Sequence, residues 1–270
     1  MDWVLVGLAG LLGGMLNAVA GGGSFITLPA LIVVGVPPVT ANATGTAALL
    51  PGYIASAWRF RRDIAFPAGL GVGAVLSLAA LGGCLGAAIL LVSGERLFAR
   101  LIPWLILFAT AAFVVGPWLL QRKTAVQGRD VAPGPDAPGG DEKNSGFTGA
   151  RQRSLPGAAG LFAVCTYGGY FNGGLGILLL AVLGLMGQTN LHGMNGLKSV
   201  VSALLTSIAV VVYLAGGVIA GGYLLLLGTM AVLGGYLGAA LAYRVPQQVL
   251  RGFIVGVGLA MSAGFFYFGA

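Results

Sequence analysis

Long apolar runs alternate along this chain with short clusters of glycine, proline and uncharged polar residues. A membrane-spanning helix needs roughly 20 apolar residues. The first run, 3–20, approaches that length, but the next run, 25–35, is too short to span alone and follows three consecutive glycines, Gly21 to Gly23. We therefore interpret these two runs as one broken helical hairpin. Further helices are predicted over 41–58, 66–92 and 97–120.

The second half of the chain repeats this order. A hairpin broken by a glycine cluster is predicted over 156–187, followed by helices over 193–215, 219–243 and 247–268. The segment 195–199 (Asn-Gly-Leu-Lys-Ser) stands where 42–46 (Asn-Ala-Thr-Gly-Thr) stands in the first half. Because each half makes an odd number of crossings, the second half enters the membrane from the opposite side. The prediction is an all-α polytopic membrane protein of two inverted repeats, each a broken or re-entrant helical hairpin followed by three transmembrane helices, an arrangement common in secondary carriers.

A polar segment separates the two halves. Residues 121–155 are rich in proline, glycine and charged residues and carry few apolar ones. Such a composition cannot bury enough apolar surface to fold and is typical of a flexible linker. The chain is therefore divided into a first transmembrane repeat at 1–120, a linker at 121–155 and a second transmembrane repeat at 156–270.

The composition supports a membrane location. Hydrophobic residues make up 57% of the chain and charged residues 8%, whereas roughly a quarter of the residues are charged in soluble domains. Small residues spaced four apart let helix backbones approach closely in lipid, and they permit a homodimer without requiring one. No basic segment precedes the first run, so that run is expected to stay in the mature protein. The glycine pairs with this spacing are Gly10/Gly14, Gly69/Gly73, Gly82/Gly86, Gly217/Gly221, Gly234/Gly238 and Gly252/Gly256.

The positive charges predict the orientation. The formal net charge is +7, but the basic residues lie at helix ends or in the linker, which argues against a nucleic-acid partner. One face of the predicted topology carries only Arg96 and Arg100. By the positive-inside rule the other face is cytoplasmic, with the linker on it and both termini outside. That face receives Arg59, Arg61, Arg62, Arg122, Lys123, Arg129, Lys143, Arg151, Arg153, Arg244 and Arg251.

The pattern of acidic and nucleophilic residues excludes several classes of function. Every acidic residue falls at a membrane edge or in a loop, which argues against a carboxylate proton relay and against a cationic substrate. No metal-ligand spacing, P-loop, catalytic triad or dinucleotide fingerprint is visible. We expect no enzyme activity, cofactor or metal. Cys84 and Cys165 both lie in apolar runs, so no disulfide is expected; Cys165 is read as a packing residue, with a thiol relay as the alternative.

Lys198 is the clearest candidate for a binding residue. It lies within a long run that carries no other charge, and ionisable residues inside the membrane are functional hypotheses by default. Lys198 either offers a positive charge to an anion or extends toward the interface. His192, the one histidine in the sequence, either couples a proton or contacts substrate, or it is a loop residue satisfied by the backbone.

Helix ends are expected to complete an anion site. Asn42 and Asn195 are favourable N-cap residues, and each either caps its helix or contacts the substrate. The glycine clusters free backbone N–H groups at the starts of the returning half-helices, and helix N-termini attract anions. Two such hairpins in an inverted repeat would direct these ends to one point at the membrane midplane. The predicted substrate-binding residues are Asn42, Thr44, Asn195, Lys198, Ser199, Gly22, Gly23, Ser24, Gly173, Gly174 and His192.

Two motifs resemble a known family. The run GGGSFITLPALIVVGVPPVTANATGTAALLPG at 21–52, with a weaker repeat in NGGLGILLLAVLGL and MNGLKSVVSALLTS, is similar to the TauE/SafE, or sulfite-exporter (TSUP), family of membrane proteins. The second copy departs from the first, with Leu180 where Pro29 stands. The resemblance implies transport of small sulfur-containing anions, such as sulfite, thiosulfate, sulfoacetate or related organosulfonates, across a bacterial plasma (inner) membrane. It fixes neither the substrate nor the direction.

The functional prediction combines the anion site with the repeats. We predict a secondary transporter in which one repeat rocks against the other around a bound sulfur-containing anion. Two alternatives stay open from the sequence: a passive anion channel of the same fold, and a membrane subunit that relays sulfur compounds to a partner.

Overall fold

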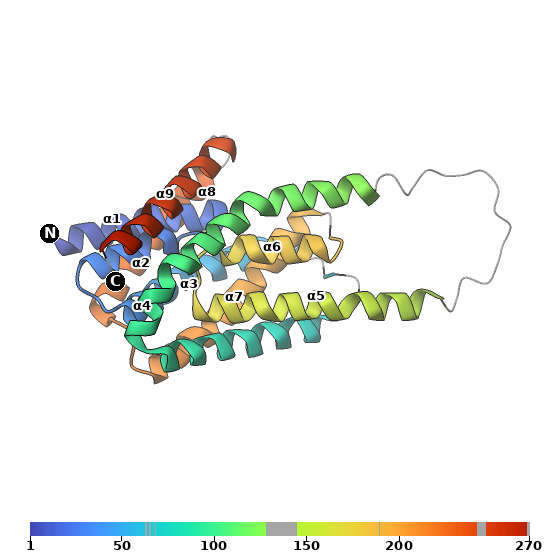
Figure 1. Cartoon of the computed structure of the whole chain (residues 1–270), viewed down its shortest axis with the longest axis horizontal. Helices are drawn as coiled ribbons and strands as arrows, with labels where there is room; N and C mark the ends of the chain where they lie inside the picture. Colours follow the sequence, from blue (N-terminus) through green and yellow to red (C-terminus); the bar gives the residue numbers. More distant parts are fainter. Residues whose placement is uncertain are drawn as a thin grey trace.

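The computed structural model describes residues 1–62, 64, 66–67, 69–127, 145–188, 190–241 and 247–268. In this part of the chain all regular structure is helical (Figure 1), as predicted. The helices are α1 (Asp2–Ala20), α2 (Ser24–Val33), α3 (Pro38–Arg59), α4 (Val72–Gln127), α5 (Ser145–Tyr170), α6 (Leu175–Leu185), α7 (Leu191–Ala215), α8 (Gly221–Leu241) and α9 (Gln247–Phe268).

Helix α4 consists of two helices joined at Gly94. The backbone of Gly94 has φ 68° and ψ 166°, a region that a residue with a Cβ atom rarely adopts. The chain turns sharply there, so that the first part of α4 runs beside α5 and the second part returns across the molecule (Figure 1). The predicted break between 92 and 97 is therefore confirmed.

Both predicted hairpins are present. Helix α2 has 10 residues and α6 has 11, which correspond to roughly 15–17 Å at about 1.5 Å per residue. Neither length crosses a hydrocarbon layer of about 30 Å. Each short helix follows a longer one, α1 or α5, after a turn rich in glycine.

The two short helices end in the same motif. After α2, Gly35 (φ 86°) donates its N–H to the Ile32 carbonyl and Val36 donates to Leu31. After α6, Gly187 (φ 89°) donates to Gly184 and the next residue donates to Leu183. This pair of bonds is the Schellman motif, which satisfies carbonyls at a helix end and needs a left-handed residue. The motif is therefore repeated at equivalent places in the two halves.

The starts of α3 and α7 correct the predicted N-caps. Both helices begin before the expected asparagine, so Asn42 and Asn195 lie inside a helix rather than at its cap. Helix α3 begins with Pro38, a favoured first residue, and its Val39 N–H donates to the Glu95 carboxylate at 2.7 Å. Helix α7 is capped by Asn190, whose Oδ1 accepts from the Gly193 N–H at 3.3 Å.

Close glycine packing joins the two halves. Helix α1 packs on α8, and α5 packs on α4. A Cβ atom added to Gly14 or to Gly234 would overlap the backbone of the facing helix, and the same holds for Gly86 against α5. The small-residue pairs at 10/14, 82/86 and 234/238 are thus helix contacts, whereas Gly252 and Gly256 have no described atom within 4 Å of an added Cβ.

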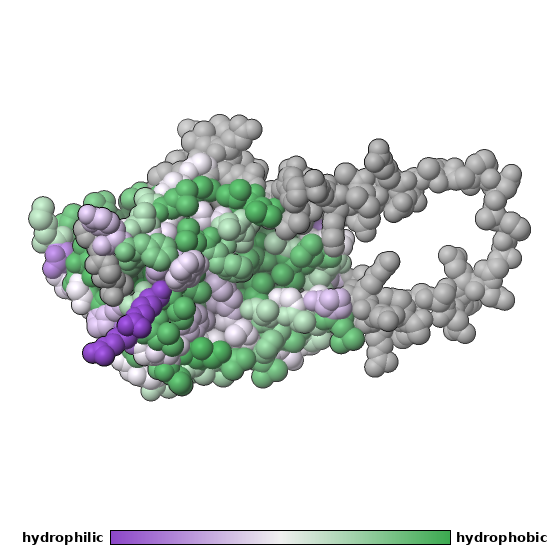
Figure 2. All heavy atoms as spheres, in the orientation of Figure 1, coloured by the Kyte–Doolittle hydropathy of each residue, from purple (hydrophilic) through white to green (hydrophobic). Residues whose placement is uncertain are grey.

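The outer surface is apolar. Figure 2 shows hydrophobic residues over much of the visible face, and large side chains such as Trp104, Leu225 and Leu81 are more than half exposed. A soluble protein rarely exposes so much contiguous apolar area. Among the described residues, four stretches are long and apolar enough to cross a membrane: Asp2–Val19, Val72–Ala112, Gly193–Ala215 and Gly221–Gly238. Ser24–Val33, Leu175–Leu185 and Val255–Tyr267 are shorter apolar helices.

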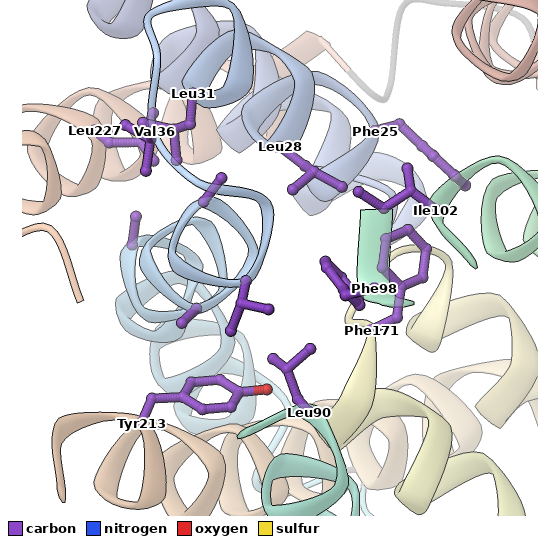
Figure 3. Packing of buried hydrophobic residues seen from close by; sticks show 14 of the residues in the cluster. Phe25, Leu28, Leu31, Val36, Leu90, Phe98, Ile102, Phe171, Tyr213 and Leu227 are labelled. Carbon is purple, nitrogen blue, oxygen red and sulfur yellow. The ribbon is translucent and has the colours of Figure 1, made fainter. Parts of the chain in front are cut away.

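Residues from both halves form the main buried core. Phe25, Leu28 and Leu31 of α2 pack with Phe98 and Ile102 of α4, and Phe171, Tyr213 and Leu227 complete the cluster (Figure 3). A second buried cluster joins the first part of α4 to α5, α6 and α7. Both hairpins therefore pack into the interior of the protein, and lipid does not surround them completely.

The two halves begin at opposite ends of the molecule. The start of α1 and the end of α9 lie together at one end in Figure 1, while α4 ends and α5 starts at the other. Helix α4 continues to Gln127 and α5 starts at Ser145, so helices extend into both ends of the expected linker. Residues 128–144, its middle, lie outside the described residues.

Candidate functional site

The tips of the two hairpins meet inside the protein. An added Cβ on Gly21, between α1 and α2, would lie 3.0 Å from the Gly176 Cα in the first turn of α6. An added Cβ on Gly174, before α6, would lie 2.9 Å from the Ala109 Cβ and 3.8 Å from the Phe25 ring of α2. The N-terminal ends of α2 and α6 thus lie side by side. The first N–H groups of a helix lack intrahelical acceptors and carry partial positive charge.

A hydroxyl group connects the two hairpins. The Tyr53 hydroxyl of α3 lies 3.1 Å from Asn17 Oδ1, in the first hairpin, and 3.2 Å from Asn172 Oδ1, in the second. Leu49, one turn earlier in α3, contacts the backbone at Gly23. Residues 49–53 lie near the middle of α3, so this polar contact lies at mid-depth in the helix bundle, where carrier sites are found.

Four predicted glycines and Ser24 gather at these tips. Gly22 and Gly23 connect α1 to α2, Ser24 is the first residue of α2, and Gly173 and Gly174 connect α5 to α6. Ser24 is 3% exposed and its hydroxyl has no hydrogen-bond partner among the described residues. The structure therefore brings together the hairpin part of the predicted site.

Asn42 and Thr44 hold helices together near the start of α3. The Asn42 side-chain amide donates to the Tyr170 carbonyl, at the end of α5, at 3.0 Å. The Thr44 hydroxyl accepts from the Ala220 N–H, at the start of α8, at 3.0 Å. Both contacts satisfy a helix end belonging to the other half of the chain.

Lys198, Asn195 and Ser199 form a group within α7. The Lys198 ammonium donates to Asn195 Oδ1 at 3.0 Å, and the Ser199 hydroxyl donates to the Asn195 carbonyl at 2.8 Å. Lys198 and Asn195 are half-buried, and Ser199 is buried. His192 lies in the first turn of α7, but its side chain is outside the described part.

The structure separates Asn42 from Asn195 and Lys198. An added Cβ on Gly196 would lie 3.2 Å from the Phe60 carbonyl, at the far end of α3 from Asn42. Asn42 and Phe60 are 18 residues apart, which corresponds to roughly 27 Å along a helix. The two asparagines occupy equivalent sequence positions at opposite ends of the α3–α7 pair, so they do not converge on one point.

Buried polar atoms without partners concentrate on the elements around the hairpin tips. In the described residues they include Ser24 Oγ, Thr27 Oγ1, Asn42 Oδ1, Thr46 Oγ1, Asn172 Nδ2, Ser202 Oγ and Thr206 Oγ1. Most buried polar groups in native proteins are paired, and exceptions call for a bound molecule or a strained functional group. These atoms belong to α2, to the α5–α6 turn, and to α3 and α7, the two central helices that contact each other.

Tyr53 and Asn172 were not predicted as site residues. Asn172 stands directly before the predicted Gly173, so its position in the glycine turn could have identified it as a site residue. Tyr53 gave none, because a tyrosine in an apolar run reads as packing or as an interfacial anchor. Its role depends on tertiary contacts with residues 36 and 119 positions away in sequence.

Neither cysteine takes part in the polar contact at the hairpin tips. Both cysteines are free, Cys84 is exposed, and Cys165 is buried beside Gly82 at the α4–α5 contact, as a packing residue would be. Among the described residues, no three His, Cys, Asp or Glu side chains are grouped to hold a metal ion.

The comparisons with known proteins identify the family. The profile described as sulfite exporter TauE/SafE matches residues 6–265, nearly the whole chain. The chain belongs to the sulfite exporter TauE/SafE family. A relative named "Probable membrane transporter protein" from Haemophilus influenzae is 30% identical over 110 residues, which cover 41% of this chain and 43% of the relative. The chain thus aligns with less than half of that relative's length. No solved structure matches the chain.

The family assignment agrees with the apolar helices described above. This TauE/SafE protein is a multi-pass membrane protein, and the resemblance found in the two glycine motifs is confirmed. The hairpin tips are its candidate substrate site.

Proposed function

We propose that this protein is a secondary transporter of a small sulfur-containing anion, such as sulfite, thiosulfate, sulfoacetate or a related organosulfonate. The anion binds between the two hairpin tips and crosses the plasma (inner) membrane of a bacterium by alternating access. The linker lies on the cytoplasmic face and both termini lie on the other.

The meeting of two half-helix N-termini carries this proposal. The start of α2 and the start of α6 lie in contact at Gly21, Gly176 and Gly174. N–H donors that lack intrahelical acceptors and the positive ends of two helix dipoles favour an anion at such a place. Paired, glycine-interrupted short helices are also the feature that marks the binding site of carriers with inverted repeats.

The pattern of helix contacts supports an inverted repeat. If α1, α2 and α3 correspond to α5, α6 and α7, then the two parts of α4 correspond to α8 and α9. Exchanging the halves converts the α1–α8 contact into the contact of α5 with the first part of α4, and both are close glycine contacts. Likewise, the α3–α8 contact becomes an α7–α4 contact, which is also present.

Lys198 is the proposed first contact for the anion on the linker side. Ala203, five residues further along α7, packs against Leu49 and Tyr53 at mid-depth. Lys198 therefore lies about 7.5 Å along the helix axis from the level of the hairpin tips. A half-buried ammonium at this depth, bonded to the neutral Asn195 amide, attracts an anion toward the centre.

The glycine contacts indicate which parts move together. Because α1 packs closely on α8 and α5 on α4, a motion that separated the sequence halves would break both contacts. We propose instead that the rocking units are the α1–α2–α8 group and the group of α5, α6 and the first part of α4, with the hairpin tips between them.

A ligand screen tests the function. The purified protein is heated with sulfite, thiosulfate, sulfoacetate, taurine, sulfate or acetate, and the unfolding temperature is measured. A ligand at 100 times its Kd stabilises the folded state by about 2.7 kcal/mol. We expect at least one sulfur-containing anion to raise the unfolding temperature and acetate not to.

The matched variants are Lys198→Ala and Arg100→Ala. We expect Lys198→Ala to weaken binding about tenfold or more, because a unit charge about 7.5 Å from the anion attracts it by roughly 2 kcal/mol at an effective dielectric constant of about 20. Arg100 is an exposed cation near the Gly94 turn, and its loss should leave binding unchanged. Uptake into proteoliposomes should saturate with concentration and show counterflow. If no sulfur-containing anion binds or is transported, the proposed function is wrong.

A further inference from the structure

The Asn17–Tyr53–Asn172 contact contains hydrogen-bond donors and acceptors that the described residues do not all pair. A tyrosine hydroxyl has one proton, yet Tyr53 lies within hydrogen-bond distance of two amide oxygens, at 3.1 and 3.2 Å. Only one of them accepts that proton at a time. The Asn172 amide nitrogen, on a residue that is 1% exposed, has no partner among the described residues.

Unpaired donors in a buried place call for an acceptor. Leaving a buried donor unsatisfied is costly, and a native exception implies a bound group or water. Ser24 supplies a second unpartnered group, 3% exposed, in the first turn of α2. Its neighbour in sequence, Gly23, packs against a residue that Tyr53 contacts, because an added Cβ on Gly23 would lie 2.8 Å from the Asn17 Cβ.

These groups belong to the two hairpins and to helix α3. Asn17 and Ser24 come from the first hairpin, Asn172 from the second, and Tyr53 from α3. A helix side chain leans toward the N-terminus of its helix, so the Tyr53 hydroxyl points back toward the middle of α3. A ligand bound here would contact both hairpins at mid-depth.

We propose that the Tyr53 hydroxyl, the Asn172 amide and the Ser24 hydroxyl form the subsite for the oxygen atoms of the transported anion, and that this subsite selects a singly charged anion over a doubly charged one. The proposal rests on the proposed function, because it assigns residues and a charge state to the same hairpin-tip site. Among the anions named there, it favours hydrogensulfite or a monosulfonate over thiosulfate and sulfoacetate, which carry two charges at neutral pH. On binding, Tyr53 turns its proton from an asparagine oxygen to the ligand.

The charge preference follows from the neutrality of the donors. None of the four side chains carries a charge, and Lys198, about 7.5 Å away along α7, is bonded to Asn195. The cost of moving an ion from water into a low-dielectric interior is large, and in the Born description it rises with the square of the charge. Neutral donors and one cation at a distance offset that cost better for one charge than for two.

The test compares probes of fixed charge. Binding of methanesulfonate, with one charge, and of sulfate, with two, is measured by calorimetry on the full-length purified protein at neutral pH. We expect methanesulfonate to bind at least tenfold more tightly than sulfate. Tyr53→Phe should weaken methanesulfonate binding about tenfold or more.

Two further variants separate ligand contact from folding. Tyr213→Phe removes the hydroxyl of another buried tyrosine, which donates to the Gly169 carbonyl, and it should leave binding unchanged. Asn172→Ala removes the unpartnered amide but keeps the Tyr53–Asn17 contact, and it should weaken binding as Tyr53→Phe does. Each variant must retain a cooperative unfolding transition without ligand.

The outcomes distinguish the two proposals. If the wild type binds sulfur-containing anions and both Tyr53→Phe and Asn172→Ala bind them equally well, the subsite is wrong and the transport function stands. If the wild type prefers sulfate, the charge preference is wrong. If no sulfur-containing anion binds the wild type in either experiment, the proposed function fails, and this subsite fails with it.

Discussion

The Asn42 side-chain amide donates a hydrogen bond of 3.0 Å to the Tyr170 carbonyl. Tyr170 ends α5, so this carbonyl is one that the helix itself leaves without an N–H donor. The bond crosses 128 positions of sequence and fixes the start of α3 against the second hairpin. Asn42 thus has a structural task whether or not its free oxygen also meets the substrate.

Replacement of Asn42 should lower stability. Asn42→Leu keeps the branching of the side chain but removes the donor to the Tyr170 carbonyl at a part-buried contact, and leaving that carbonyl unpaired costs about 1–3 kcal/mol. We expect a lower unfolding temperature in detergent, measured by tryptophan fluorescence. An unfolding temperature equal to that of the wild type would contradict the assignment of this bond as a stabilising link.

Thr46 offers the opposite case. It lies one turn after Asn42, is 1% exposed, and its hydroxyl has no partner among the described residues. Thr46→Val replaces the hydroxyl by a methyl group of similar size, so stability should stay the same or rise, because an unpaired buried hydroxyl is removed. A clear loss of stability would show that the hydroxyl is paired in the folded protein. A loss of transport at normal stability would identify Thr46 as a substrate contact.

The glycine contacts predict that two glycine-to-alanine substitutions change the stability of the protein in opposite directions. An added Cβ at Gly234 would overlap the α1 backbone at Leu11, so Gly234→Ala should destabilise the protein by about 1–3 kcal/mol through overpacking. Gly252 in α9 has no described atom within 4 Å of an added Cβ, and Gly252→Ala should stabilise the protein by up to about 1 kcal/mol through helix propensity. Thermal unfolding of the two variants side by side checks both. Equal effects would mean that α1 and α8 are not in close contact.

Glu95 should stabilise the start of α3. Its carboxylate accepts from the Val39 N–H at 2.7 Å, and a negative charge near a helix N-terminus is favourable. Glu95→Ala should lower stability by about 0.5–2 kcal/mol, as loss of a capping group does. Glu95→Gln keeps an acceptor oxygen and should lose less. The prediction fails if the alanine and glutamine variants unfold at the same temperature.

The repeat plan was readable from the sequence because its signals are local. Glycine clusters and run lengths located the broken hairpins, and the hydrophilic turn around Gly94 located the division of α4. The N-cap of α3 was misjudged because its partner, Glu95, lies 56 positions away, whereas that of α7, Asn190, is local. Sequence equivalence of Asn42 and Asn195 suggested a common site, but equivalent residues in antiparallel helices lie at opposite ends. Tyr53 required the folded hairpins before its contacts with Asn17 and Asn172 existed.

In the proposed transport mechanism, the contact between Gly21 and Gly176 limits how quickly the two hairpins separate. At this point the two hairpins touch through main-chain atoms, with no side chain between them. A barrier made of side chains opens when a rotamer changes, within picoseconds to nanoseconds, whereas collective helix movements take microseconds to milliseconds. Opening a main-chain contact requires the slower movement. We therefore expect turnover to be limited by helix motion, with a steep dependence on temperature and on the thickness of the surrounding bilayer, and far below the ion flux of an open pore.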